Sequence, residues 1–225
     1  MTPDYWLERW HRGETGWHLP EINLHLRDGW PRLGLPTARL VFVPLCGKTL
    51  DLLWLASQGH RVLGVEISPL AVEEFFAEQG LIPEITDELP FRRYQVDELT
   101  LLCGDFFALT PDHLREVGAI YDRASLIALP PDLRPRYAQH LKTLMPAAVG
   151  GLLITLDYDQ KQMAGPPFAV HRDEVERLFG DRYAISELAT LDVLDESPGF
   201  RQRGLTALTE QVWRLNPRGN YSASS

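Results

Sequence analysis

The sequence predicts a single α/β domain with a doubly wound, mostly parallel seven-stranded sheet and an antiparallel edge at its C-terminal end. Three observations lead to this prediction. Short apolar runs alternate with helical patterns through the first half of the chain. Two late apolar runs follow one another without a helix between them. The chain has 225 residues, of which 44% are hydrophobic and 24% charged, values typical of a soluble globular domain.

The regular pattern begins after residue 38. Apolar runs at 39–45 and 60–67 have the composition of buried strands. Residues 49–58 have helical periodicity and precede Gly59, a residue that commonly ends helices. Residues 68–79 predict a second helix, because Pro at the first helical position is favoured. Strand, helix, strand and helix in this order indicate a parallel βαβ unit.

The remaining pattern extends the sheet towards the C-terminus. The segment 81–96 lacks clear periodicity and is interpreted as either a hairpin or a lid. We expect further strands at 99–103, 119–122, 150–158, 182–194 and 204–215, helices at 131–145 and 171–179, and a turn at 197–199.

The N-terminal region 1–38 is rich in tryptophan and is expected to lie over the domain as a lid. Thr2 and Pro3 predict a helix over 2–12, with Thr2 as its N-cap. A second short helix is expected at 21–27. Residues 1–215 are therefore predicted to form one domain, and 216–225 a flexible tail.

Composition excludes several classes of protein. A net charge of −9 argues against nucleic-acid binding, which needs a basic face. No segment reaches the length of a membrane span, and no secretory signal is recognised, so a cytoplasmic protein is expected. Cys46 and Cys103 lie in apolar runs and predict buried free thiols. The seven histidines show no metal-ligand spacing, so no metal site is predicted.

Candidate binding residues follow the predicted strands, because open parallel sheets bind ligands beyond their carboxyl ends. Gly47 follows the first strand, and Glu66 ends the second, nineteen residues later. An acidic residue at about this distance commonly binds ribose hydroxyls. The loop contains a single glycine, whereas loops that bind a pyrophosphate contain several and surround it with backbone N–H donors. The loop therefore favours a nucleoside without phosphates. An exposed charge is the favoured interpretation of Lys48.

Two further pairs of candidate residues, each an acidic residue and the residue after it, follow later strands. Asp105 and Phe106 are candidates for contact with an adenine, although a helix cap followed by a core residue is equally compatible with the pattern. Asp122 and Arg123 would face the reacting centre, with a surface ion pair as the alternative. For Trp6, Trp17 and Trp30, core packing is favoured over catalysis.

The sequence resembles the bacterial thiopurine S-methyltransferases. The resemblance covers about residues 4–215, and it depends on the sequence blocks Trp6–Trp10, Gly16–His18, Val43–Asp51, Gly64–Ser68 and Tyr121–Leu129.

The resemblance implies a class I methyltransferase fold and S-adenosylmethionine as the methyl donor. The acceptor would be the sulfur of an aromatic or heterocyclic thiol, or a selenium or tellurium compound, and the protein would be a monomer. It also implies cofactor contacts at the following residues: Trp10, Leu45, Glu66, Asp105, Phe106 and Arg123, the last of which is also the candidate catalytic residue.

Three other functions remain as alternatives. One is a halide or thiocyanate methyltransferase on the same scaffold. Another is a nicotinamide-dependent oxidoreductase, which the absence of a G-x-G-x-x-G loop disfavours. The third is a nucleoside-binding module without catalytic activity.

Overall fold

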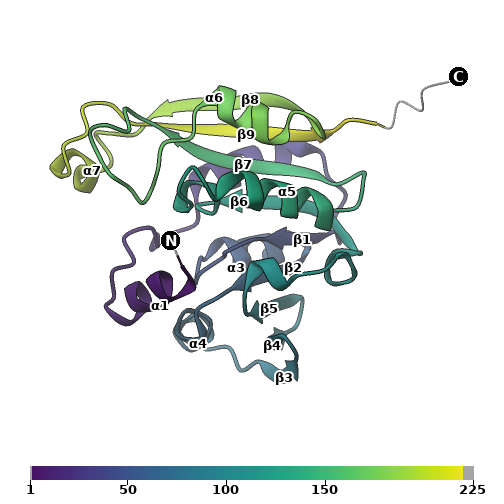
Figure 1. Cartoon of the computed structure of the whole chain (residues 1–225). Helices are drawn as coiled ribbons and strands as arrows, with labels where there is room; N and C mark the ends of the chain where they lie inside the picture. The colour runs from purple at the N-terminus through teal and green to yellow at the C-terminus, as the bar shows by residue number, and fades with distance from the viewer. Residues whose placement is uncertain (1, 220–225) are drawn as a thin grey trace, which may run out of the picture.

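A computed structural model describes residues 2–219, which fold around one mixed sheet (Figure 1). The nine strands of this region lie in the order β3-β4-β5-β2-β1-β6-β7-β9-β8. Their bounds are β1 Leu40–Val43, β2 Arg61–Glu66, β3 Glu84–Glu88, β4 Phe91–Val96, β5 Leu99–Cys103, β6 Val117–Arg123, β7 Gly150–Asp157, β8 Tyr183–Asp192 and β9 Thr209–Pro217.

The strand order reverses at β1. This strand pairs in parallel with β2 on one side and with β6 on the other. The parallel region continues through β5 beyond β2 and through β7 beyond β6. The carboxyl ends of these strands therefore meet at one edge of the sheet, and the predicted position of the switch point next to the first strand is confirmed.

The sheet has two strands more than the predicted seven, because the segment 81–96 forms the antiparallel hairpin β3–β4 beside β5. Every residue of β3 is exposed, so this edge strand carries no apolar alternation that the sequence could display. In β4, Phe91 and Tyr94 are buried three residues apart, a spacing that does not indicate a strand. The hairpin interpretation of 81–96 is thus correct.

The antiparallel C-terminal edge is confirmed, with β9 between β7 and β8. Its connection differs from the predicted turn at 197–199, because those residues enter the short helix α7, Pro198–Gln202. β9 also continues to Pro217, so its last two residues lie in the predicted tail. The rest of the predicted tail from residue 220 lies outside the described residues.

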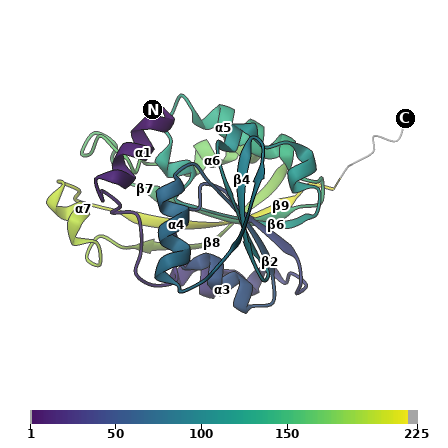
Figure 2. The same cartoon turned by 90° about the horizontal axis from the view of Figure 1, so that it is seen from below.

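Helices cover both faces of the sheet (Figure 2). One apolar core lies between the sheet and α5 and α6, and the other lies between the sheet and α2, α3 and α4. The bounds of the six longer helices are α1 Pro3–His11, α2 Leu24–Gly29, α3 Asp51–Ser57, α4 Pro69–Glu78, α5 Arg134–Leu144 and α6 Arg172–Phe179. Short 3-10 helices lie at η1 Pro31–Leu33, η2 Phe106–Ala108, η3 Pro111–Leu114 and η4 Leu126–Ala128.

The N-terminal helices form close to their predicted positions. Helix α1 begins at Pro3 with Thr2 at the N-cap position, although the Thr2 side chain makes no capping hydrogen bond. The second helix begins at Leu24 because the Asn23 side chain accepts hydrogen bonds from the next two free amides, those of His25 and Leu26. Figure 1 shows α1 and α7 at the same end of the sheet.

Candidate functional site

The loops that follow β1 and β2 are joined by a buried carboxylate. Glu66 is 5% exposed, and its Oε2 accepts a hydrogen bond of 2.8 Å from the amide of Gly47. Its Oε1 accepts a hydrogen bond of 2.9 Å from the amide of Ser68, the N-cap residue of α4. Burial raises the pKa of Glu66, and these amides act against that shift because they stabilise the charged form.

Glu66 keeps hydrogen-bonding capacity for a ligand. A carboxylate oxygen offers about two acceptor sites, and each oxygen of Glu66 uses one of them on an amide. The remaining sites suit the paired hydroxyls of a ribose.

Trp10 covers this loop. Its side chain is 5% exposed, and its Cζ2 lies 3.2 Å from the position that a Cβ at residue 47 would occupy. Gly47 also has a φ of +54°, a conformation that favours glycine. The glycine therefore allows both the turn and the close approach of the indole. Leu45, two residues earlier, is partly buried and packs against the core that faces α5 and α6.

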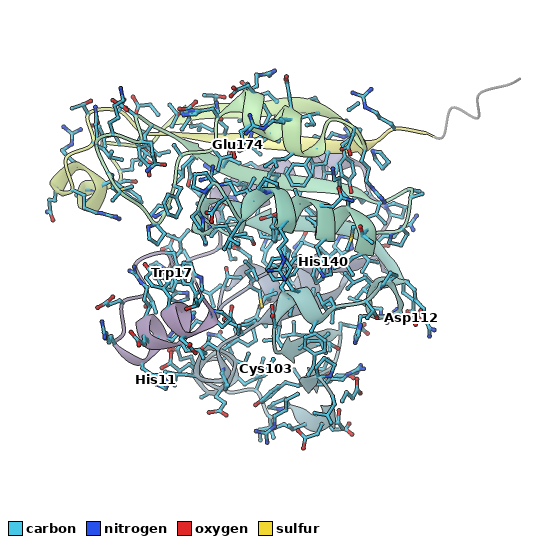
Figure 3. The ribbon with its side chains drawn as sticks, in the orientation of Figure 1. His11, Trp17, Cys103, Asp112, His140 and Glu174 are labelled. Atoms are coloured by element: carbon cyan, nitrogen blue, oxygen red, sulfur yellow. The ribbon has the colours of Figure 1, made fainter. Side chains whose placement is uncertain are left out.

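Aromatic contacts hold the N-terminal segment over the loop. The ring centroids of Trp10 and Trp17 are 5.7 Å apart, and those of Trp17 and Trp6 are 5.4 Å apart, all edge to face. The Arg9 guanidinium lies 5.1 Å from the centroid of Trp17. In Figure 3, Trp17 lies on the side of this segment nearest β7, whereas the exposed His11 lies on its far side. Packing is thus an observed role of these tryptophans.

Asp105 and Phe106 adopt the arrangement of a cap and a core residue. The Asp105 carboxylate accepts a hydrogen bond of 2.9 Å from the amide of Phe107 and caps η2. Phe106 is 2% exposed and packs against Tyr137 of α5. The Asp105 side chain itself is exposed, at the carboxyl end of β5. The ring of Phe106 is therefore committed to the core, whereas Asp105 is accessible.

Asp122 and Arg123 point away from each other and form no ion pair. Asp122 is 1% exposed, and its Oδ2 accepts a hydrogen bond of 2.7 Å from the hydroxyl of Tyr137. Burial raises the pKa of Asp122 to about 6, although the hydrogen bond from Tyr137 opposes that shift. Arg123 is half-buried at the end of β6 and forms no ion pair within the described residues. The surface-pair alternative is therefore wrong.

Lys48 is not the exposed charge that the sequence predicts. Its side chain is 12% exposed, and its ammonium lies 2.9 Å from Glu74 and 2.6 Å from Glu78, both on α4. Lys48 and Arg123 lower the pKa of the half-buried His18, together with the larger effect of burial. His18 therefore lies within electrostatic range of the carboxyl ends of both β1 and β6.

Asp51 has a role that the sequence analysis does not assign. It is 1% exposed, and it accepts hydrogen bonds of 2.8 Å from the amide of Asn23 and from the hydroxyl of Tyr121. It thereby joins the N-terminal segment to α3 and β6. One feature of the sequence could have indicated this role: Asp51 ends the block Val43–Asp51 and is the only charged residue of the otherwise mostly apolar helix that begins there.

A second missed feature lies at the carboxyl end of β7. The loop that contains Pro166 and Phe168 is bound to the sheet edge by a 2.7 Å hydrogen bond from the amide of Phe168 to the carbonyl of Ile127. Arg203, after α7, donates to the carbonyl of Pro166 at 3.2 Å. This loop and the α7 region share a small apolar cluster that consists of Leu156, Tyr158, Met163, Ala169, Leu194, Leu205 and Leu208. Long loops carry little periodicity, so the sequence pattern shows no such assembly.

The described residues form no cluster of metal-ligand type. No three His, Cys, Asp or Glu side chains among them gather closely enough to hold a metal ion. Cys46 and Cys103 are buried and unpaired, as predicted. No helix in residues 2–219 has the length and apolar composition needed to cross a membrane.

Comparison with known sequences identifies the family. A family model described as thiopurine S-methyltransferase matches residues 1–218. The chain belongs to the thiopurine S-methyltransferase family. It is 54% identical over 215 residues to a thiopurine S-methyltransferase of Pseudomonas fluorescens, covering 96% of this chain and 99% of that protein. It is 51% identical over 218 residues to one of Nitrosospira multiformis, covering 97% and 99% respectively.

Solved structures confirm the fold. A methyltransferase of Anabaena variabilis described as S-adenosylmethionine-dependent has a TM-score of 0.63 at 16% identity, covering 96% of this chain and 95% of that one. A 1,6-didemethyltoxoflavin-N1-methyltransferase of Burkholderia thailandensis has a TM-score of 0.60 at 15% identity, covering 95% and 87%. The predicted class I methyltransferase fold is therefore confirmed for this family member.

We expect Asp51→Ala to lower the free energy of unfolding by about 2–4 kcal/mol, because it leaves a buried amide and a buried hydroxyl without their acceptor. Asp51→Asn should lose less than half as much, since it retains one acceptor oxygen and the Tyr121 hydroxyl can accept from its amide. Urea unfolding measures both variants. Asp112→Ala, at an exposed position of η3, is the matched control. Equal stability of Asp51→Ala and wild type would contradict this anchoring role.

The raised pKa of Asp122 predicts a pH dependence of stability. The folded protein holds this proton more tightly than the unfolded chain, so the stabilisation is complete below about pH 4 and is lost as the pH rises through about 6. Relative to Asp122→Asn, which does not titrate, wild type should lose about 3 kcal/mol of unfolding free energy across this interval. Urea unfolding at several pH values tests this, and parallel curves for the two proteins would refute it.

Proposed function

We propose that this protein transfers the methyl group of S-adenosylmethionine to the sulfur of an aromatic or heterocyclic thiol, including thiopurines. Membership of the family over residues 1–218 and relatives that share about half of their residues over almost their full length support this activity. The structural observation that carries it is the buried Glu66 carboxylate at the switch point, beneath Trp10.

The residues present fit this cofactor. Glu66 would bind the ribose hydroxyls through its free acceptor sites, and exposed Asp105 would accept from the adenine amine. Phe106 would contribute its backbone, since its ring lies in the core. Leu45 would bind along the cofactor from the loop after β1. When bound, S-adenosylmethionine supplies an electrophilic methyl group on a sulfonium, whose positive charge the face of Trp10 would attract.

Arg123 is proposed to act on the methyl acceptor, in addition to the cofactor contact that the family resemblance implies for it. It is half-buried at the carboxyl end of β6 and forms no ion pair within residues 2–219, so its guanidinium is available for an anion. A thiolate held near this charge is favoured over the thiol, because an opposite charge stabilises the ionised form. The methyl group then passes in line from the sulfonium sulfur to the acceptor sulfur. The rate would depend on alignment and exclusion of water.

The two segments at the carboxyl edge would enclose the acceptor. The N-terminal segment covers the loop at Gly47 through Trp10, and we propose that residues 1–38 act as its lid. The loop that holds Pro166 and Phe168 would form the opposite wall. An apolar wall suits a planar heterocycle.

The setting of the enzyme is also a proposal. We infer that it works as a monomer in the cytoplasm on small acceptors. Its net charge of −9 disfavours nucleic acid as a partner. Selenium and tellurium compounds are proposed as further acceptors, because their anions are polarisable nucleophiles like thiolates. Halide methylation and binding without catalysis are outcomes that the assays below distinguish.

Calorimetry tests the cofactor. We expect wild type to bind S-adenosylmethionine and not NADH. Glu66→Gln should weaken S-adenosylmethionine binding about 10- to 100-fold, because it removes a charged acceptor from the ribose hydroxyls. Glu84→Gln, on the exposed edge strand β3, should bind like wild type. Binding of NADH in preference to S-adenosylmethionine would refute the proposed function.

A labelled-methyl transfer assay tests the acceptor and Arg123. The acceptors are a thiopurine, thiophenol, selenite, tellurite, bromide and thiocyanate, and we expect the highest rates with the two thiols. Arg123→Ala should lower kcat/KM for thiols about 100-fold. It should also shift the pH–rate profile to higher pH, because ionisation of the thiol is no longer assisted. Arg115→Ala, exposed after η3, is the control. Unchanged acceptor kinetics in Arg123→Ala would exclude the role, and preference for bromide would support halide methylation.

A further inference from the structure

The loops after β1 and β6 are tied together by one buried side chain. The hydroxyl of Ser125 donates a hydrogen bond of 2.7 Å to the carbonyl of Pro44. Ser125 is 0% exposed, so water does not compete for this bond. Pro44 directly precedes Leu45, and Ser125 lies two residues after Arg123. The bond therefore joins two loops that each contain a proposed cofactor-binding residue.

Both loops contain a residue with an unfavourable backbone conformation. Leu45 has a φ of +45° and Ala124 a φ of +65°, in the left-handed region that favours glycine. Non-glycine residues remain in this region only where surrounding contacts impose it, and such residues gather at functional sites. Each of these two lies next to one end of the Ser125–Pro44 bond. The bond is therefore placed to maintain both conformations.

The bond is the central member of a series of hydrogen bonds across the switch point. On one side, the hydroxyl of Tyr137 on α5 binds Asp122, the penultimate residue of β6. On the other side, the amide of Gly47 at the end of the β1 loop binds Glu66, which also accepts from the N-cap of α4. Each loop is thus held at both ends, and the Ser125–Pro44 bond alone crosses from one loop to the other in this series.

We propose that Ser125 is a positioning residue, which sets Leu45 and Arg123 at a fixed separation so that both can engage one bound cofactor molecule. This inference rests on the proposed function of the site. Ser125 itself is buried and does not contact the ligand. Its hydroxyl acts through the backbone of the two loops, and its loss would let Leu45 and Ala124 relax from the left-handed conformation. Binding would then require the two loops to be ordered again, which weakens affinity.

The test is Ser125→Ala, which removes the hydroxyl from a site where the alanine side chain fits. We expect S-adenosylhomocysteine to bind about 10-fold more weakly by calorimetry, at a temperature well below the unfolding midpoint of the variant. The KM for S-adenosylmethionine should rise by a similar factor, with kcat changed less than threefold. Ser186→Ala, at an exposed position of β8, should leave both values unchanged.

Two further measurements keep the proposal falsifiable. If Ser125→Ala does not fold, Ser125→Cys retains a weaker donor of similar volume, and its affinity for S-adenosylhomocysteine should fall below that of wild type. A lower unfolding midpoint with S-adenosylhomocysteine affinity within twofold of wild type would show a merely structural role and overturn the inference. Failure of wild type to bind S-adenosylhomocysteine would instead overturn the proposed function, so the two failures are distinguishable.

Discussion

The arrangement of the site depends on the buried Glu66 carboxylate and the hydrogen bonds that it accepts from two backbone amides. A single glycine cannot surround a ligand with donors, so the loop after β1 needs another element to give it a fixed shape. Glu66 provides this by binding the amides of Gly47 and Ser68 from a position that is 5% exposed. Such charge-assisted bonds are stronger inside the protein than at its surface. The loop, strand β2 and helix α4 are therefore held as one unit at the switch point.

The N-terminal segment covers the loop after β1, at the carboxyl end of the parallel strands. It is attached at two places with different chemistry. Trp10 packs on Gly47, which only glycine permits at this distance, and Asp51 binds the amide of Asn23. The first attachment is an apolar contact, whereas the second is a buried hydrogen bond. Since apolar contacts are not directional, the Trp10 contact can open at less cost than the anchor at Asn23, and this suits a lid.

Asp122 and Arg123 illustrate how adjacent residues of one strand acquire different roles. Alternation in β6 turns Asp122 towards α5, where Tyr137 binds it, and turns Arg123 to the opposite face of the sheet. The carboxylate is therefore unavailable to neutralise the guanidinium, which leaves Arg123 free to attract an anionic acceptor. Ser125 then joins this strand end to the loop of β1. A structural acid, a proposed catalytic cation and a proposed positioning hydroxyl thus lie within a stretch of four residues.

The sequence by itself determined the βαβ pattern, the switch point beside the first strand and the candidate pair Gly47 and Glu66, because these follow from local periodicity and spacing. It could not resolve the β3–β4 hairpin, whose outer strand is exposed throughout and carries no apolar pattern. It also left Asp105 and Phe106 ambiguous, and its interpretation of Lys48 as an exposed charge is wrong. Tertiary structure alone decided that Phe106 belongs to the core, that Lys48 binds α4, and that Asp51 and Ser125 join distant segments. The physical reason is that hydrogen bonds between residues 28 or 81 positions apart leave no periodic signal in either segment.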